Sequence, residues 1–442
     1  MFHQTMTKMV QSYRSYIDKP LKDEILQLNK SFSRIPCFLH KAMEHRMMRS
    51  KQLSVVIEFE PNHYKDGYRQ VCQVINGKRK CGVRKQFSLI SCCSADVTPD
   101  ALNQVFRSCN HIKKVYLNRT VHALLDKAVP SVNADNLQRN NNHLTGKGVT
   151  IAVVDTGIHP HEDLQGRIAG FVDFIENKTA PYDDNGHGTH CAGCAVGSGA
   201  ASVGQYQGPA AKANIVGVKV LDRNGAGTLE TMMQGLQWCM EYNNNHENKI
   251  DIINLSLGYP AQRYDEATDD PMVKMVEKAW ENGIVVVAAA GNEGPEPQTI
   301  ASPGISEKII TVGALDDQDT AVKEDDEAAD FSSRGPTVYG ETKPDVIAPG
   351  VNIISLRSPR STLDKLQKTN RVGKNYFSMS GTSMACPLVA GVCALLLEAD
   401  PSISPDRVKK LLMEGADTWS DENPNIYGAG YVNAENSLNL LK

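Results

Sequence analysis

A turn of small residues just before a long apolar run could position a serine for chemistry. Within residues 377–387, Gly381 and Thr382 favour a turn and a cap, which predicts Ser383 at the start of a helix. Unpaired backbone N–H groups at a helix start favour negative charge, which suits an alkoxide or an oxyanion. Pro387 withholds the N–H that would pair with the Ser383 carbonyl, which indicates a specialised turn. Taken alone, however, a serine in such a turn is most often a helix cap.

Two further stretches supply an acid and a base. Residues 149–157 form an apolar, β-rich run that ends at Asp155 and a glycine turn. Residues 184–193 place His187 between two glycines, just before small residues that favour a helix. A serine hydroxyl is a poor nucleophile without a base, so a histidine and an acid elsewhere in the chain change how Ser383 is interpreted.

The three blocks, in the order Asp155, His187 and Ser383, resemble those of the subtilisin-like serine proteases, or subtilases. The resemblance covers about residues 130–442 and is greatest to the intracellular bacterial subtilases. It implies that Ser383 is the nucleophile, that His187 takes and returns its proton, and that Asp155 holds the imidazole in the useful tautomer. The remaining histidines near these blocks are interpreted as structural or surface residues: His159, His161 and His190.

The same resemblance extends to the groups that would hold a peptide. It implies that the Asn292 amide and the Ser383 backbone N–H stabilise an oxyanion, although an ordinary Gly-Asn turn is the alternative for Asn292. The segments matched to substrate binding are Gly225, Ala226, Gly227, Ser256, Leu257 and Gly258. A pocket of small side chains with room for a large apolar residue is expected from Ala288, Ala289, Ala290 and Gly291.

The metal expectation rests on one residue. Asp163 matches a calcium ligand of the family, but the loop that should complete the site, residues 197–207, is longer and lacks the expected asparagine. Strong calcium sites need several oxygen ligands. We therefore expect no required cofactor, and calcium at Asp163 is the one metal site that the resemblance suggests.

Beyond residue 148, strand-like and helical stretches alternate. The expected strands are Val149–Val154, Ile215–Val220, Ile250–Leu255, Ile284–Ala289 and Ile309–Val312. The expected helices include Thr228–Asn243, Asp270–Glu281 and Pro405–Met413. This alternation predicts an α/β fold, with a mainly parallel sheet and helices on both faces. The resemblance to subtilases implies that the arrangement is subtilisin-like. Three charged loops are interpreted as solvated insertions without a role: 263–270, 316–330 and 358–374.

The part of the chain before the sheet is expected to have three segments. Residues 1–48 are interpreted as a helical extension, 49–128 as a small α+β domain, and 129–148 as a linker to a catalytic domain at 149–442. Within the α+β domain, strands are expected at 53–59, 86–92 and 112–121 and a helix at 100–109. By position and topology this domain resembles the subtilase pro-region, which acts as chaperone and inhibitor. An unrelated α+β domain is the alternative.

Charge divides unevenly along the chain. Residues 1–130 hold 22 Lys and Arg against 10 Asp and Glu, a net charge of +12, whereas the remainder holds 25 against 41, a net charge of −16. A basic N-terminal part would be attracted to an acidic catalytic part, and we expect the run 121–125 to enter the cleft like a product. Nucleic-acid binding is the alternative for the basic part, but no recognised motif supports it.

Composition limits where the protein would work. The chain has 442 residues, 41% hydrophobic and 22% charged, which is ordinary for a globular protein. No run approaches the roughly 20 apolar residues of a membrane span, and residues 1–30 have no apolar core of a secretory signal. Eleven cysteines, an odd number in apolar surroundings, favour reduced thiols. We therefore expect a cytoplasmic protein with no membrane partner.

Together these features predict a serine endopeptidase that hydrolyses protein or peptide substrates through an acyl-enzyme. Small pocket residues and a cleft that pairs with backbone predict broad specificity, with preference for large apolar side chains. The alternative from another class is a catalytically weak subtilase-fold binding or chaperone protein. The complete set of Asp155, His187, Ser383 and Asn292 favours the enzyme.

Overall fold

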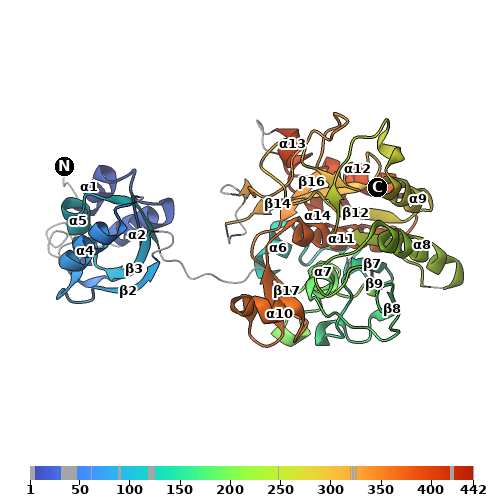
Figure 1. Cartoon of the computed structure of the whole chain (residues 1–442), viewed down its shortest axis with the longest axis horizontal. Coiled ribbons are helices and arrows are strands. Elements are labelled where there is room, and N and C mark those ends of the chain that lie inside the picture. The colour runs from blue at the N-terminus through green and yellow to red at the C-terminus, as the bar shows by residue number, and fades with distance from the viewer. Residues whose placement is uncertain are drawn as a thin grey trace. The chain divides into compact units, whose positions relative to one another are not determined.

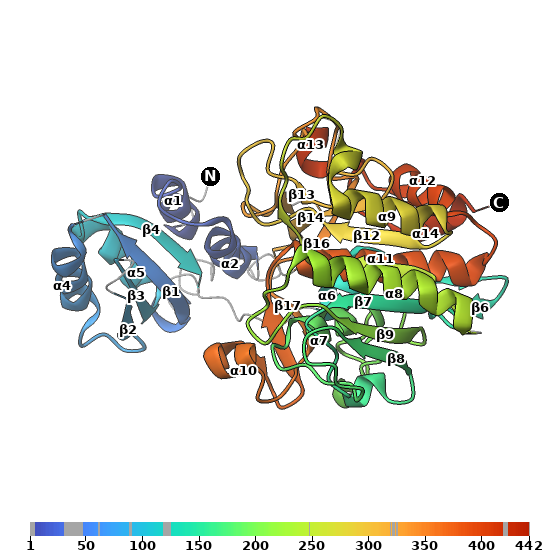
Figure 2. The same cartoon turned by 45° about the vertical axis from the view of Figure 1, so that its right-hand side comes forward.

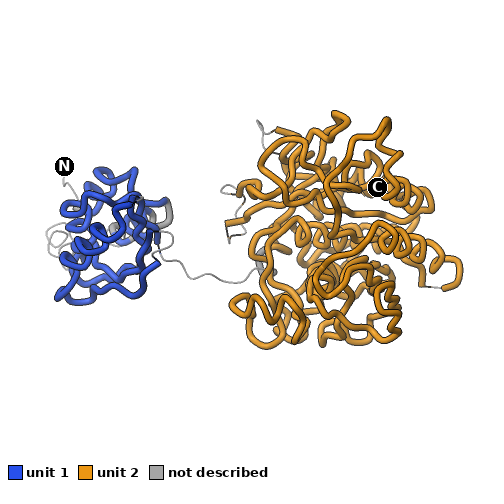
Figure 3. The backbone as a smooth tube through the Cα atoms, in the orientation of Figure 1, with its two compact units in different colours: residues 1–121 blue, residues 122–442 orange. Residues whose placement is uncertain are grey.

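A computed structural model places the chain in two compact units, residues 1–121 and 122–442 (Figures 1 and 3). The structure describes residues 5–30, 47–60, 62–87, 91–117, 125–246, 248–318, 320, 323, 326–418 and 423–441. The expected run 121–125, proposed to enter the cleft, falls almost entirely outside this described part of the chain.

The first unit contains a four-stranded antiparallel sheet and two helices that connect its strands. Its sheet elements follow the order β1 (Leu53–Phe59), α4 (Tyr64–Ile75), β2 (Gly82–Phe87), β3 (Cys92–Val97), α5 (Pro99–Ser108) and β4 (Ile112–Leu117). The strand order β2-β3-β1-β4, with every pair antiparallel, is the ferredoxin-like arrangement. The expected strand 53–59 and helix 100–109 are confirmed. The expected strand 86–92 is wrong, because Gln86 and Phe87 end β2, Ser91 is a turn residue and Cys92 begins β3, while residues 88–90 lie outside the described part of the chain.

The expected helical extension is not separate from this sheet. Two helices do form, α1 (Thr5–Ser12) and α2 (Lys19–Lys30). Their apolar side chains, among them Met6, Leu21 and Ile25, are fully buried in the same core as strand β1. The amphipathic pattern predicts the helices correctly, but it does not reveal what their apolar faces pack against.

The second unit is built on a mainly parallel sheet. The strand order is β15-β14-β12-β10-β7-β9-β8, with β16 also paired to β14, and only the β14–β15 pair is antiparallel. The strands are β7 (Thr150–Asp155), β8 (Ile168–Asp173), β9 (Asn214–Lys219), β10 (Ile252–Leu255), β12 (Val285–Ala289), β14 (Ile310–Asp316), β15 (Glu327–Ala328) and β16 (Val346–Pro349). All five expected strands are present, which confirms the predicted fold class.

Helices cover both faces of this sheet (Figure 2). On one face lie α7 (His187–Val196) and α11 (Thr382–Ala399), which pack against each other, and on the other lie α8 (Leu229–Asn245) and α9 (Pro271–Glu281). The other helices of this unit are α6 (Leu125–Ser131), α10 (Thr362–Leu366), α12 (Pro405–Gly415), α13 (Pro424–Tyr427) and α14 (Ala434–Asn439). The Ser404 hydroxyl caps α12 by accepting from the Arg407 amide at 3.3 Å.

Shorter elements complete the unit. They are β5 (Gln138–Arg139), β6 (Asn142–His143), β11 (Tyr259–Pro260), β13 (Ala301–Ser302), β17 (Ile353–Leu356), β18 (Arg371–Val372) and β19 (Tyr376–Met379), with short 3₁₀ turns η3 (Glu162–Leu164), η4 (Ala200–Ser202), η5 (Ala267–Asp269) and η7 (Lys368–Asn370). Strand β19 lies between β17 and β18 in a separate antiparallel sheet and leads directly into the turn before α11.

One stretch differs from its expected role, and one helix has an unusually apolar composition. The expected linker 129–148 belongs to the second unit, because Ala128, Val129 and Val132 are buried in its core. Helix α11 is the one helix of the described chain that is long and apolar enough to cross a membrane, yet 83% of it is buried inside the protein. Burial of that kind is typical of a core helix.

Candidate active site

Strand β7 delivers the acid. Asp155 is its last residue, and its side chain is completely buried. The carboxylate accepts a hydrogen bond from the Thr156 amide at 2.7 Å, and both its oxygens lie close to Nδ1 of His187, at 2.8 and 2.9 Å. A carboxylate held in this way fixes the ring orientation and requires the proton on Nδ1, which leaves Nε2 as the basic nitrogen.

A tight turn brings His187 to that carboxylate. His187 is the first residue of α7, and Gly186 before it has a φ of 108°, a conformation that favours glycine. The carboxylate of Asp183 organises the turn by accepting from the amides of Asn185 and Gly186 and, on its other oxygen, from Thr189. The position of the imidazole is therefore set by backbone hydrogen bonds as well as by Asp155.

The electrostatic surroundings of His187 favour its protonated form. Burial acts to lower the pKa of the imidazole, but the charge of Asp155 and its hydrogen bond, with a contribution from Cys191, outweigh burial. The pKa of His187 is consequently raised well above its ordinary value. The Cys191 thiol lies 3.8 Å from Nδ1, and burial raises its own pKa, so it remains a neutral thiol.

Ser383 occupies the first turn of α11, as its sequence context predicts. Gly381 caps the helix with φ 155° and ψ 159°, a combination open in practice only to glycine. Pro387 lies inside the helix and offers no N–H to the Ser383 carbonyl, which is satisfied instead by the Ser256 hydroxyl at 2.9 Å and the Cys191 thiol at 3.3 Å. The Ser383 hydroxyl donates to the Ser256 carbonyl at 3.1 Å.

Asn292 lies beside the same helix start. Its Oδ1 accepts from the backbone N–H of Thr382 at 2.9 Å and from the Thr382 hydroxyl at 3.1 Å. Because a backbone N–H can only donate, the atom facing it must be the amide oxygen, which assigns the orientation of the side chain. The Nδ2 group is thereby directed away from Thr382.

One cavity of about 890 Å³ collects most of the predicted side chains. Besides His187, Asn292 and Ser383, its lining includes Gly225, Ala226, Gly227, Ser256, Leu257, Gly258, Ala289, Gly291 and Glu293. Asp155 is buried behind His187 and does not line it. The cavity thus brings together predicted site residues that lie up to 196 positions apart in the sequence.

The prediction that two of the alanines line the cavity is wrong. Ala288 and Ala290 are completely buried and do not line the cavity, whereas Ala289 and Gly291 do. Successive side chains of a strand point to opposite faces, so alternate residues at the end of β12 turn into the core. Ala290 packs there with Val273, Ile300 and Ile305.

Two of the other histidines, His161 and His190, have structural partners for their side chains. His190 is buried on α7, and its Nε2 reaches the carbonyls of Ile353 and Phe377 at 3.1 and 3.0 Å. Burial, together with the nearby His187, lowers the pKa of His190 to about 3. His161 is engaged through both nitrogens, with Nε2 2.9 Å from the Asn375 carbonyl and Nδ1 accepting from the Asp163 amide at 3.1 Å.

Sequence reasoning missed two charged residues that support the site. Asp183 was overlooked although it lies four residues before His187. Lys219 ends β9 with its side chain fully buried, and its Nζ donates to the carbonyls of Thr156 and Leu221 at 2.6 and 2.9 Å and to Asp184 at 2.8 Å. A single lysine in the apolar run 215–220 is the signal that could have revealed it.

Asp163 does not have the surroundings of a calcium ligand. Its buried carboxylate accepts from the backbone amides of Gly199 and Ala201 at 3.0 and 2.9 Å and from the Tyr376 hydroxyl at 2.9 Å. Calcium requires six to eight oxygen ligands, but here the loop turns N–H donors toward the carboxylate. The expected calcium site at Asp163 is therefore not supported, because protein donors occupy the carboxylate.

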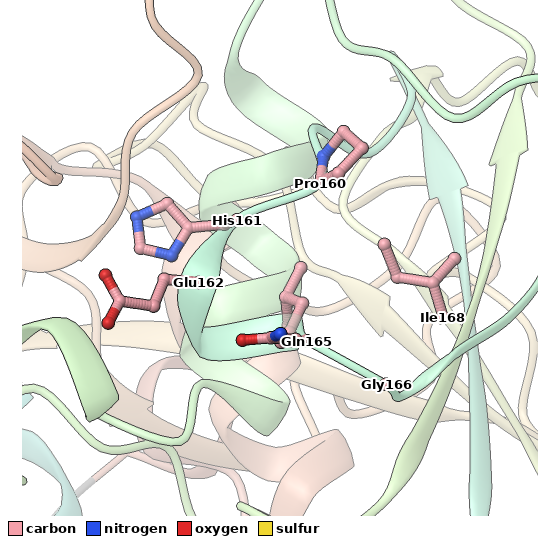
Figure 4. Close-up of a pocket in the computed structure, with 7 residues that line it drawn as sticks. Pro160, His161, Glu162, Gln165, Gly166 and Ile168 are labelled. Carbon is pink, nitrogen blue, oxygen red and sulfur yellow. The ribbon is translucent and has the colours of Figure 1, made fainter.

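Other clusters offer little for metals or ligands. In the first unit Glu60, His63 and His111 bring ligand atoms within 4.8 Å of one another. The two rings stack at 4.1 Å with their planes only 4° apart, so their in-plane lone pairs run parallel and do not converge on an ion. A hollow of about 370 Å³ beside η3 is lined by His161, Glu162 and Gln165, but both nitrogens of His161 already have partners (Figure 4).

Comparison with known proteins agrees with this geometry. The family described as "Subtilase family" matches residues 146–430. Serine protease AprX of Bacillus subtilis (strain 168) is 56% identical over 439 residues, which cover 99% of each chain. Subtilisin BL of Lederbergia lenta is 35% identical over 296 residues, 67% of this chain and 93% of that one.

The solved structures lead to the same family. The crystal structure of a cold adapted subtilisin-like serine proteinase matches with a TM-score of 0.50 and 30% identity, covering 70% of this chain and 97% of that chain. The sequence match extends over both units, whereas the family match lies within the second. The chain belongs to the subtilase family and is a serine protease.

Proposed function

We propose that Ser383 is the nucleophile of this protease, with His187 as general base and Asp155 as the group that orients it. The observation that carries the proposal is the Asp155–His187 pair, which lies at the wall of the cavity that also contains Ser383. The Ser383 hydroxyl donates to the Ser256 carbonyl, and rotation about its Cα–Cβ bond would turn it away from that carbonyl. Contacts of this kind often tighten only when substrate is bound.

The chemistry follows from these positions. His187 accepts the Ser383 proton through Nε2 as the hydroxyl attacks the peptide carbonyl, and it then returns the proton to the leaving amine. The raised pKa of the imidazole expresses how strongly Asp155 stabilises the positive charge that forms in this step. Water then repeats the sequence on the acyl-enzyme and releases the second product.

The negative charge that forms on the substrate oxygen has two proposed donors. One is the Nδ2 group of Asn292, and the other is the backbone N–H of Ser383 at the start of α11. Because the Asn292 oxygen is tied to Thr382, its amide is already oriented before substrate arrives. Such preorganised donors stabilise the transition state without reorganisation.

The cavity supports a broad specificity. Its floor is made of backbone and small residues near Ala289 and Gly291, with Leu257 and Ile300 adding apolar surface. Residues 225–227 and 256–258 border the cavity, and all of them except Leu257 are small. We propose that an extended peptide binds along them and that large apolar side chains before the scissile bond are preferred.

The first unit is proposed to be an inhibitor and folding chaperone for the second. It has its own core and sheet, and its topology is that of a small α+β domain. Its excess of basic residues complements the acidic remainder of the chain. Attachment to the same chain makes any such inhibition intramolecular and thus strong until the connection is cut.

We also propose that the protein works in the cytoplasm and without a calcium ion at Asp163. The ten described cysteines are all free thiols, which suits a reducing compartment. The donors around Asp163 supply the loop closure that an ion would otherwise provide.

The decisive experiment labels the nucleophile. We expect a fluorophosphonate probe to modify the full-length protein at Ser383, and the Ser383→Ala variant to lose both labelling and casein hydrolysis while keeping its circular dichroism spectrum. Each protein should come from a protease-deficient host. A Ser383→Ala protein that still hydrolyses casein would overturn the assignment. A wild-type protein that folds but neither labels nor hydrolyses would favour the binding or chaperone alternative.

A further inference from the structure

The segment between β17 and β19, expected to be a solvated insertion, is folded against the active site. Residues 357–375 leave the end of β17, form α10 and return through β18, which pairs with β19. Strand β19 then leads within four residues to Ser383. A side chain on this segment therefore has a short, rigid connection to the nucleophile.

A buried carboxylate holds the segment in shape. Asp364 on α10 is only 2% exposed and accepts from Arg357 at 2.6 and 3.1 Å and from Arg371 at 2.7 and 3.0 Å. Burial acts to raise the pKa of Asp364, but these hydrogen bonds and one from the Arg360 amide lower it to about 2. The ion pairs thus persist at any pH at which the enzyme would work.

Three hydrogen bonds dock α10 and the residues just before it onto the turn that positions His187. The amide of Thr362 donates to the Asp184 carbonyl at 2.8 Å, and the amide of Leu363 donates to the Asn185 carbonyl at 3.0 Å. The hydroxyl of Ser358 donates to the Asp183 carbonyl at 2.6 Å. The turn before His187 and the inserted segment consequently form one rigid wall.

Leu363 is the residue that this wall turns toward the cavity. It is partly exposed and lines the same 890 Å³ cavity as His187, Met379 and Ser383. Leu363 lies beside the residue that precedes His187, since a Cβ added at Gly186 would lie 3.8 Å from the Leu363 Cβ, an ordinary van der Waals distance. Leu366, one helical turn later, is 76% exposed and does not line the cavity.

From this placement we infer that Leu363 determines specificity by contacting the substrate side chain that lies over His187. Its isobutyl group offers apolar surface, so the favoured substrate residue at that position is aliphatic or aromatic. The inference rests on the proposed function of Ser383 and His187 and adds a specificity residue to it. Asp364 acts through α10, as a positioning residue.

The test uses the full-length enzyme and internally quenched peptides varied one position at a time on both sides of the scissile bond. Rates are normalised to active sites titrated with a fluorophosphonate. In Leu363→Ala, the preference for leucine over glycine at one position next to the scissile bond should fall roughly tenfold in kcat/KM. In Leu363→Glu, the preference for lysine over leucine at that position should rise roughly fivefold.

The matched controls are Leu366→Ala and Leu366→Glu, which change the same helix outside the cavity and should retain the wild-type profile. A gain of preference for lysine cannot arise from misfolding, so Leu363→Glu remains informative if Leu363→Ala is unstable. Unchanged profiles in both Leu363 variants, or the same change in the Leu366 variants, would overturn the inference. Failure of the wild-type enzyme to label or cleave would instead refute the proposed function.

Discussion

Asn292 combines a structural task with the proposed catalytic one, and two substitutions can separate them. Its oxygen accepts from the N–H and hydroxyl of the buried Thr382, and its nitrogen is the proposed oxyanion donor. Asn292→Ala removes both functions. Two buried donors at the start of α11 then lack a partner, at a cost of about 1–3 kcal/mol in stability. Loss of the oxyanion donor should lower kcat by about 10²–10³, the range measured for that donor in a subtilisin.

Asn292→Asp keeps the shape and the acceptor but replaces the donor with a second oxygen. Stability should therefore remain within about 1 kcal/mol of the parent, since a carboxylate also suits a helix start. Activity should fall further than in Asn292→Ala. Two negative charges about 4 Å apart repel by about 4 kcal/mol at an effective dielectric constant near 20, and the oxyanion would meet such a charge.

Turnover and stability need separate measurements. Values of kcat and KM are taken on a chromogenic peptide with titrated active sites, and stability is followed by urea unfolding in a Ser383→Ala background that cannot digest itself. We expect kcat to fall in the order parent, Ala, Asp, with KM little changed because the amide acts on the transition state. An Asn292→Asp enzyme with parental kcat would refute the oxyanion role. An Asn292→Ala protein of parental stability would refute the role of the Thr382 contacts.

Three further predictions concern pH, calcium and the first unit. Asp155 is the main cause that raises the pKa of His187, so the neutral imidazole accumulates only as pH rises through that raised pKa. Asp155→Asn should therefore move the acid limb of the kcat/KM profile down by about 1–3 pH units. An acid limb that does not move would contradict this. EGTA should leave the melting temperature unchanged. Tyr376→Phe, which removes a hydrogen-bond donor to Asp163, should instead cost about 1 kcal/mol in stability. A melting temperature that depends on calcium would count against the proposal that Asp163 binds no calcium. Purified residues 1–121 added to residues 122–442 should inhibit hydrolysis, more slowly at 1 M than at 0.1 M salt because the Debye length falls from about 10 to about 3 Å; no inhibition at any concentration would exclude the inhibitor role.

The fragment boundaries in that experiment come from the structure and could not come from composition. Residues 129–148 are polar enough to suggest a linker, but Val129 and Val132 are buried in the second unit. A fragment that began near Pro130 would lose Ala128 and Val129 from that core. Pattern and composition report local preference, whereas burial depends on partners far along the chain.

The same distinction explains what sequence could predict at the site. A strand followed by an acid, and a glycine turn before a helix, are local signals, so Asp155 and His187 could be placed on their elements in advance. The partners of Asp364 and the docking of Leu363 depend on segments that the sequence does not join. Charged residues at 358–374 are therefore predicted to form a solvated loop, although two of them, Asp364 and Arg371, form an ion-pair cluster with Arg357 around the buried carboxylate.

Local rules are broken around the proposed active site, and each violation has a specific compensation. Pro387 removes a helical hydrogen bond, and Ser256 and Cys191 satisfy the freed carbonyl of Ser383. Lys219 is charged in the core and finds three oxygen partners around the acid–base pair. Such departures cost stability unless they are compensated, and a fold keeps them where they position a reacting group. That they converge on Ser383 and His187 is an argument for this site independent of any family resemblance.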